Sequence, residues 1–330
     1  METRMFGTTD LRVSVVGFGA WAIGGPVMAA KTPIGWGDVD DEVSMKALRR
    51  AFELGVTFFD TADFYGLGHS EELMGNVLGR KNDIVIATKV GHLLDENGSI
   101  RYGYSKKHIL AACEKSLRRL QRDRIDLYQL HSARLAHLEA GECVEAMEQL
   151  RQEGKIRYWG LSLNTFHPEP EAEFLMSQKL SNGFQLVLNL INQRAALLAA
   201  KAASRGYGII TRMPLQFGLL TGKISRGTTF PPNDHRSFRL SPEIVEKSLN
   251  ELKDLETIRE KYKISETSLA ISYCASMEGV STVIPGIRTP EQAILNTSGI
   301  VRLADEDLRV IRGLYEKRLK EVVEMMEVRG

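Results

Sequence analysis

Residues Gly55–Gly75, GVTFFDTADFYGLGHSEELMG, carry the pattern that predicts the fold. A short apolar run that contains Phe58 and Phe59 ends in a single acid, Asp60. The loop that follows presents Tyr65 beside glycines, and acidic residues then begin a helical pattern. Barrel enzymes display catalytic groups in this way, at the end of a buried strand and in the loop after it.

The same alternation of a β-rich run and an amphipathic stretch continues along the chain. Strands are expected near Val13–Phe18, Thr57–Phe59, Ile84–Thr88, Leu127–Leu130, Ile156–Leu161, Phe184–Val187, Gly208–Thr211 and Thr282–Ile284. Helices are expected at about Glu42–Leu54, Glu71–Leu78, Lys106–Leu120, Leu138–Gln152, Pro170–Gln178, Ala195–Ser204, Ser265–Met277 and Glu291–Thr297. Because each strand precedes a helix and the composition shows no break, we expect one α/β domain over residues 1–330, a single (β/α)8 (TIM) barrel.

Several segments exceed the minimum that a barrel needs. Arg4–Val13 is expected to form a β-hairpin around Gly7–Asp10 that closes the barrel floor. Gly24–Asp38 and Gly218–Lys263 follow predicted strands, so both are expected to wall a pocket on the C-terminal face. The tail from Asp305 onward has a helical period, and packing on the barrel exterior is the favoured interpretation over a partner-binding helix.

The composition indicates a globular protein with an ample core, since 43% of the 330 residues are hydrophobic. A net charge of +1 without a basic block gives no indication of a nucleic-acid partner. No apolar run approaches the roughly 20 residues that cross a bilayer, and the start shows no secretory signal. Three cysteines lie far apart, at 113, 143 and 274, so we expect reduced thiols in a cytoplasmic protein.

Ionisable residues stand at or just past the ends of successive predicted strands. Asp60 and Tyr65 follow the second strand, Lys89 follows the third and His131 follows the fourth. The carboxyl ends of neighbouring barrel strands meet on one face, so we expect these four side chains to converge.

These four residue types together suit proton transfer to a carbonyl oxygen. A tyrosine hydroxyl is the proton donor, and a nearby ammonium favours the phenolate that remains. A carboxylate keeps that ammonium charged, and a histidine orients the carbonyl through a hydrogen bond. None of them supplies electrons, so a hydride donor is needed, and a dissociable nicotinamide is the simplest one.

Each residue also has a purely structural interpretation. Asp60 and Lys89 would form an ion pair across strand ends, Tyr65 would be a surface tyrosine, and His131 a buried histidine. Their occurrence together on three consecutive strands favours catalysis.

In order and strand context, Asp60, Tyr65, Lys89 and His131 resemble the catalytic aspartate, tyrosine, lysine and histidine of the aldo-keto reductase family. The resemblance extends over most of the chain. It implies an NADPH-dependent oxidoreductase that reduces aldehydes or ketones to alcohols, with Tyr65 as general acid.

The resemblance also implies NADP(H) as the cofactor. Ser162 and Gln185 resemble residues that hold the nicotinamide carboxamide, and the Pro214–Lys223 loop resembles the one that wraps the pyrophosphate. Arg288 lies in a segment that resembles the adenosine-phosphate site, and its planar fork suits a 2′-phosphate. The implied cofactor residues are Ser162, Gln185, Arg212, Leu215, Gly218, Leu220, Gly222, Lys223, Gly286, Arg288, Gln292 and Asn296.

Two positions depart from the family pattern. Leu163 stands directly after the serine where the family usually has asparagine, so the role of Asn164 stays open. Arg212 stands where many members place an aromatic ring that stacks on the nicotinamide. Its guanidinium plane can stack, but its charge opposes the oxidised, cationic ring, so reduced cofactor is expected to bind more tightly.

Other functions have weaker support. The GFGAWA stretch at residues 17–22 fits a dinucleotide fingerprint, but a glycine- and proline-containing loop follows it where a Rossmann helix would begin. The histidines lack metal-helix spacing, so no metal site is expected. A Schiff-base enzyme with Lys89 as nucleophile is a second enzyme class. A cofactor-binding regulatory or redox-sensing subunit with little turnover is the non-enzymatic alternative.

The substrate is expected to be a small-molecule carbonyl. Trp21, Phe64 and His92 are the candidate substrate-binding residues, with Trp36 and the segment 223–240 nearby. The sequence selects neither a particular carbonyl nor an oligomeric state.

Overall fold

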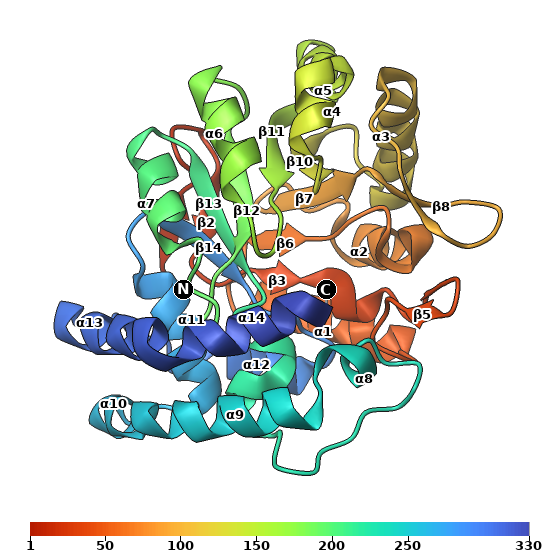
Figure 1. Cartoon of the computed structure of the whole chain (residues 1–330). Coiled ribbons are helices and arrows are strands. Elements are labelled where there is room, and N and C mark those ends of the chain that lie inside the picture. The colour runs from red at the N-terminus through yellow and green to blue at the C-terminus, as the bar shows by residue number, and fades with distance from the viewer. Residues whose placement is uncertain (330) are drawn as a thin grey trace.

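Eight parallel strands form the centre of the computed structural model, which describes residues 1–329. The strands, in chain order, are β3 (Phe18–Gly19), β6 (Phe58–Asp60), β7 (Val85–Val90), β10 (Ile125–His131), β11 (Ile156–Ser162), β12 (Gly183–Val187), β13 (Gly208–Arg212) and β14 (Val280–Ile284). Each pairs with the next in the chain, and parallel bridges from Val16 to Val283 and from Gly19 to Gly286 bring the first strand against the last. The sheet curls into a barrel with helices outside it, which confirms the predicted fold (Figure 1).

The outer helices pack their apolar faces on this barrel. They are α1 (Asp41–Glu53), α2 (His69–Leu78), α3 (Lys106–Leu120), α4 (Leu135–Ala140), α5 (Glu142–Gln152), α6 (Glu169–Ser177), α7 (Ala196–Ser204), α11 (Glu266–Ser276) and α12 (Pro290–Thr297). In α3 the Ser105 hydroxyl accepts the backbone N–H of His108 at 3.3 Å and begins the helix. Ile109, Cys113 and Leu117 lie on its buried face, as the sequence period predicts.

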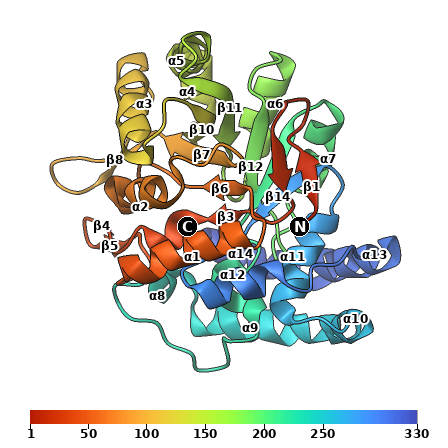
Figure 2. The same cartoon turned by 180° about the vertical axis from the view of Figure 1, so that it is seen from behind.

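An N-terminal hairpin closes one end of the barrel. Strands β1 (Thr3–Met5) and β2 (Arg12–Ser14) pair antiparallel, and Figure 2 shows them at the back of the molecule as seen in Figure 1. Phe6 and Leu11 belong to an apolar cluster with residues of the barrel strands, among them Phe58. The predicted floor is therefore confirmed, and the opposite end, where the strands finish, is left for the site.

Two sequence predictions of single elements are wrong. The stretch Leu138–Gln152 is not one helix, because Gly141 has φ of 83° and a left-handed residue breaks the helix between α4 and α5. The stretch Val13–Phe18 is not one strand either. Its first part pairs within the hairpin as β2, and only β3 joins the barrel.

The additional segments lie at the ends and on the outside of the barrel. They are η1 (Ala20–Ile23), β4 (Met28–Ala29), β5 (Thr32–Pro33), η2 (Tyr65–Gly68), η3 (Gln216–Thr221), α8 (Arg236–Arg239), α9 (Pro242–Leu252), η4 (Lys253–Leu255), α10 (Glu256–Tyr262), α13 (Asp305–Leu314), η5 (Tyr315–Leu319) and α14 (Lys320–Arg329). The tail buries Ile311, Leu319 and Val322 completely, so it packs on the barrel exterior as predicted. A further hairpin, β8 (His92–Leu94) with β9 (Ile100–Tyr102), was not predicted. Within residues 1–329, no helix has both the length and the apolar character to cross a membrane.

Candidate active site

The carboxyl ends of the barrel strands bring the predicted polar residues to one face. Asp60, Lys89 and His131 lie at or near the last positions of β6, β7 and β10. The parallel registers pair Asp60 with Ala87 and His131 with Ser162, so the strand ends are in step around the barrel. Because the carboxyl ends of neighbouring strands lie at one face of the barrel, these three side chains lie close together, as predicted.

Tyr65 reaches this face from the loop after β6. Gly66, which follows it, has φ of 62°, and a Cβ atom there would lie 2.0 Å from the carbonyl oxygen of Gly24. Only glycine fits such a turn without displacing the neighbouring loop. The turn holds the Tyr65 hydroxyl oxygen 3.3 Å from Lys89 Nζ, and the Tyr65 ring 6.3 Å from the Trp21 ring.

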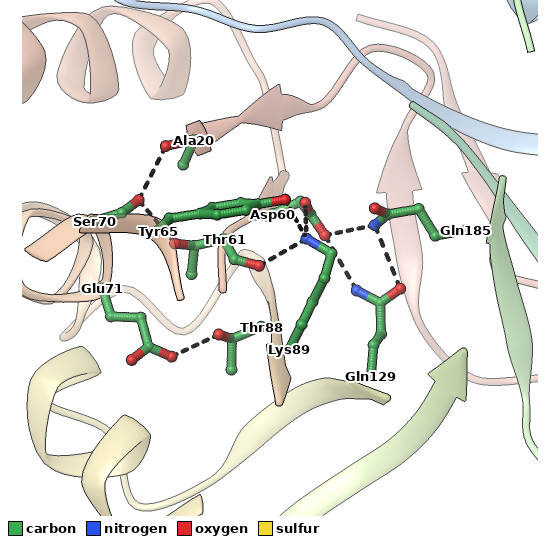
Figure 3. Close-up of polar contacts among 10 residues, drawn as sticks. All are labelled: Ala20, Asp60, Thr61, Tyr65, Ser70, Glu71, Thr88, Lys89, Gln129 and Gln185. Carbon is green, nitrogen blue, oxygen red and sulfur yellow. Dashed lines mark hydrogen bonds and ion pairs between the residues drawn. The ribbon is translucent and has the colours of Figure 1, made fainter. Parts of the chain in front are cut away.

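Lys89 and Asp60 form a fully buried ion pair. Lys89 Nζ lies 2.5 Å from Asp60 Oδ2, and their side chains are 0% and 2% exposed. Lys89 also donates to the carbonyl oxygen of Thr61 at 2.8 Å (Figure 3). Burial alone lowers the pKa of an ammonium, but the Asp60 carboxylate and the Tyr65 hydroxyl outweigh burial and raise the pKa of Lys89. The ammonium is therefore charged beside Tyr65.

Two glutamines hold the other oxygen of Asp60. Gln185 Nε2 donates to Asp60 Oδ1 at 2.7 Å and Gln129 Nε2 donates to the same atom at 3.1 Å (Figure 3). Gln129 did not emerge from the sequence, although its place two residues before His131 on the same strand face was a usable signal. Gln185, predicted to hold the nicotinamide amide, here orients the carboxylate that pairs with Lys89.

His131 lines the opening together with His92. Their rings are 4.1 Å apart and 20° from parallel, while the Tyr65 ring stands edge-on to His131 at 5.8 Å. Burial lowers the pKa of both imidazoles, and His92 itself and Lys89 lower that of His131 further. The pKa of His92 is about 4 and burial holds the pKa of His131 well below its usual range, so both rings are neutral at physiological pH.

A cavity of about 480 Å³ begins at Tyr65 and His131. It runs past the three candidate substrate residues, Trp21, Phe64 and His92, and past Trp36. Of the predicted cofactor residues, those that line it are Ser162, Gln185, Arg212, Leu215, Gly218, Lys223, Gly286, Gln292 and Asn296. One cavity therefore joins nine of the twelve predicted cofactor residues to the three candidate substrate residues and to Asp60, Tyr65 and His131, while Lys89 is fully buried and does not line it.

Four of the residues considered for the cofactor lie outside the cavity lining. Leu220 is buried in the core at 3% exposure, and Gly222 faces the carboxylate of Glu266. Arg288 donates to the carbonyl oxygens of Trp36 and Asp38 at 3.3 and 2.7 Å. The fourth, Asn164, accepts the backbone N–H groups of two following residues through Oδ1, so its side chain caps a turn.

The charge of the cavity suits an anionic cofactor. Among the described residues that line it, Asp60 is the sole acid, and it is paired with Lys89. The cations that line it are Lys223, Arg212, Arg236 and Arg239. A Cβ atom at Gly286 would meet no atom within 4 Å, so its backbone faces open space, whereas a Cβ atom at Gly218, which also lines the cavity, would lie 3.5 Å from Ile224 Cδ1. Positive charge with exposed backbone is the setting in which phosphates bind.

No group of three or more His, Cys, Asp or Glu side chains placed to hold a metal ion occurs within residues 1–329. The three cysteines are free and buried.

The comparisons with known proteins agree with this geometry. The model of the Aldo/keto reductase family matches residues 15–316. An uncharacterized oxidoreductase of Bacillus subtilis, YqkF, is 30% identical over an alignment of 318 residues that covers 94% of this chain and 96% of YqkF. The holo form of the aldo-keto reductase AKR11C1 of Bacillus halodurans superposes with a TM-score of 0.77, at 29% identity and 95% and 96% coverage. The glycerol dehydrogenase AKR11B4 of Gluconobacter oxydans gives 0.80, at 29% identity and 96% and 95% coverage.

The fold and the relatives thus define the chain as an oxidoreductase built on a (β/α)8 barrel. It belongs to the aldo-keto reductase family.

Proposed function

We propose that this protein is an NADPH-dependent reductase of aldehydes or ketones, formed by one domain over residues 1–330 and located in the cytoplasm. The observation that carries the proposal is the Tyr65 hydroxyl, 3.3 Å from a buried ammonium and beside His131 at the mouth of a cavity. A reduced nicotinamide, when bound, supplies the hydride that adds to the carbonyl carbon. The chain itself must then deliver one proton to the carbonyl oxygen.

Tyr65 delivers that proton in the proposed mechanism. Neutral His131 donates a hydrogen bond to the carbonyl oxygen and holds it near the Tyr65 hydroxyl. As the oxygen gains negative charge, the O–H bond of Tyr65 breaks, and the Lys89 ammonium stabilises the phenolate. Asp60 keeps Lys89 charged and in place, and the two glutamine amides fix Asp60.

NADP(H) is the proposed cofactor because the cations and exposed backbones of the cavity fit a phosphate-bearing dinucleotide. Ser162 is proposed to hold the nicotinamide carboxamide, and Gly218 and Lys223 the pyrophosphate. Gly286, Gln292 and Asn296 are proposed to border the adenosine phosphate, where α12 begins with Thr289 as its cap. Arg288 uses two of its five N–H donors on backbone carbonyls, and the others remain to bind a 2′-phosphate.

Replacing Arg288 by alanine is expected to raise the KM for NADPH about 10- to 100-fold and to leave the KM for NADH unchanged. Hydrogen bonds to charged groups contribute about 1.5–3 kcal/mol. NADH lacks the 2′-phosphate, so it makes none of the hydrogen bonds that the substitution removes. Steady-state kinetics with both cofactors measures this. Arg309→Ala, at an exposed position of α13 outside the cavity lining, is the control. A wild-type preference for NADH refutes the assignment.

Arg212 is expected to make the reduced cofactor bind at least tenfold more tightly than the oxidised one. Its guanidinium is held by Leu163 O and Thr165 Oγ1, each at 3.1 Å, and no described carboxylate lies within hydrogen-bond distance of it. Burial lowers the pKa of Arg212, with opposing contributions from Tyr65 and Asp60. A positive charge here opposes an oxidised, cationic nicotinamide.

Fluorescence titration with NADPH and NADP⁺ gives the two dissociation constants, and Arg212→Tyr should make them nearly equal. Equal constants for the wild type contradict the proposal.

The alternatives are less well supported by the site. A Schiff-base enzyme needs a neutral lysine, whereas Lys89 is fully buried in an ion pair and its pKa is raised. Trapping of a carbonyl substrate on Lys89 by borohydride would favour that class. A regulatory or redox-sensing subunit would bind NADPH and show little turnover, although Tyr65, Lys89 and His131 lie together as a reductase requires.

A further inference from the structure

His92 and His131 form a stacked pair at the mouth of the cavity. Their ring centroids lie 4.1 Å apart with an interplanar angle of 20°, so His92 covers one face of His131. Both residues line the cavity that contains Tyr65. Stacking at this distance excludes water from that face of the His131 ring.

The surrounding structure holds His92 over His131. Gly91 has φ of 132°, and a Cβ atom there would lie 2.1 Å from the Tyr104 ring, so this glycine lets the chain turn between Lys89 and His92. The Phe64 ring contacts the His92 ring edge-on at 5.4 Å, and the Tyr102 ring does so from the other hairpin strand at 5.5 Å. The His92 ring is therefore fixed by its neighbours.

A backbone hydrogen bond fixes the position of His131, and one of its two ring nitrogens is buried. The Tyr104 hydroxyl donates to the backbone carbonyl oxygen of His131 at 2.5 Å. Nδ1 of His131 is buried and has no hydrogen-bond partner among the described residues. Protonating this ring would bury an N–H without an acceptor, which is costly, and Nε2 is left as the nitrogen that can meet a substrate.

The cations around the pair disfavour a charged imidazole. Lys89 of β7 and Arg212 of β13 act on both rings, and Arg134 acts on His92. Burial is the largest cause that lowers the pKa of each imidazole, and each cation lowers it further. The remaining titratable neighbours are three tyrosines, Tyr65, Tyr102 and Tyr104, and the paired Asp60.

We propose that His92 is a positioning residue for carbonyl reduction: its stacked ring shields His131 from water and keeps it neutral, oriented and able to donate from Nε2 to the carbonyl oxygen. The inference rests on the proposed reductase function. A protonated His131 would give its proton to the developing alkoxide in competition with Tyr65 and would add a third cation beside Lys89 and Arg212. The shield therefore keeps Tyr65 as the proton donor at acidic pH.

The test compares His92→Ala with His92→Phe across pH. In the wild type, kcat/KM for an aldehyde is expected to stay flat through about pH 6, where an ordinary histidine would titrate, because the pKa of each imidazole is lowered. His92→Ala hydrates His131, so a new acid limb with a midpoint of about 6 should appear, with KM raised about fivefold at neutral pH. His92→Phe restores an apolar, non-titrating cover and should keep the flat profile.

A second readout is independent of turnover. Proton–carbon NMR of ring-labelled histidine follows the imidazoles, with the His131 signal identified by its loss in His131→Gln. The His131 signal should show no titration near the ordinary histidine pKa in the wild type and His92→Phe, but should titrate near pH 6 in His92→Ala. Titration of His131 near pH 6 in the wild type, or identical profiles for the alanine and phenylalanine variants, overturns the proposal. If the wild type reduces no carbonyl but the NMR titrations come out as expected, the proposed reductase function is wrong, while the inference that His92 shields His131 still holds.

Discussion

Replacing Tyr65 by phenylalanine is expected to lower kcat for carbonyl reduction about a thousandfold while NADPH binds with nearly its wild-type affinity. The substitution removes only the hydroxyl oxygen, which lies 3.3 Å from Lys89 Nζ, and leaves the ring against Trp21. Positioned general acids contribute roughly 10²- to 10⁴-fold. Within residues 1–329, Tyr65 is the only hydroxyl among the hydrogen-bond partners of the Lys89 ammonium. Steady-state kinetics and NADPH titration by fluorescence measure the two effects separately.

Tyr207→Phe serves as the matched control. Tyr207 is buried against Phe184 in the core, and its hydroxyl makes a single long hydrogen bond of 3.4 Å to Leu175 O. This variant should retain wild-type kcat. If Tyr65→Phe also turns over at close to the wild-type rate, the proton comes from another group and the assignment of Tyr65 is wrong.

Replacing Lys89 by methionine is expected to destabilise the protein by about 3–5 kcal/mol as well as to remove activity. Removal of one partner from a buried ion pair leaves an uncompensated charge, which costs this amount. Here the stranded group is Asp60, 2% exposed, with hydrogen bonds from Gln129 and Gln185 as its remaining support. Urea unfolding followed by circular dichroism gives the change in the free energy of unfolding.

Two further variants test whether the loss of stability comes from the uncompensated buried charge of Asp60. Asp60→Asn combined with Lys89→Met removes both charges and should recover part of the stability, although not the activity. Lys155→Met breaks an exposed pair with Glu114 and Glu153 and should cost less than about 1 kcal/mol. Equal destabilisation by Lys89→Met and Lys155→Met would show that the buried pair contributes nothing special to the fold.

The sequence was sufficient to predict the barrel because the patterns that indicate its strands and helices are local in the chain. Apolar runs of strand length alternate with helical periods, and the same period that marks Ile109, Cys113 and Leu117 determines the face that α3 buries. Residues at strand ends converge in any parallel barrel, so the proximity of Asp60, Lys89 and His131 followed from topology alone. The resemblance to the family then supplied the extent of the cofactor region.

What the sequence did not predict depends on contacts between distant segments. Gln129 shares a strand face with His131, but its hydrogen bond to Asp60 on another strand is a long-range contact that spacing along the chain does not specify. The β8–β9 hairpin places His92 over His131, and that stack arises from a turn at Gly91 whose geometry the sequence does not specify. The break at Gly141 was missed because an isolated glycine in a helical pattern is often tolerated.

The most direct test of the account is a single-turnover experiment on a panel of aldehydes and ketones, followed by the loss of NADPH absorbance, with the wild type and Tyr65→Phe side by side. The account predicts that the wild type oxidises one NADPH per carbonyl reduced for at least one member of the panel, and that Tyr65→Phe binds NADPH but oxidises it about a thousandfold more slowly. Tight binding of NADPH by the wild type with no oxidation by any carbonyl, or equal rates for the two proteins, would contradict it.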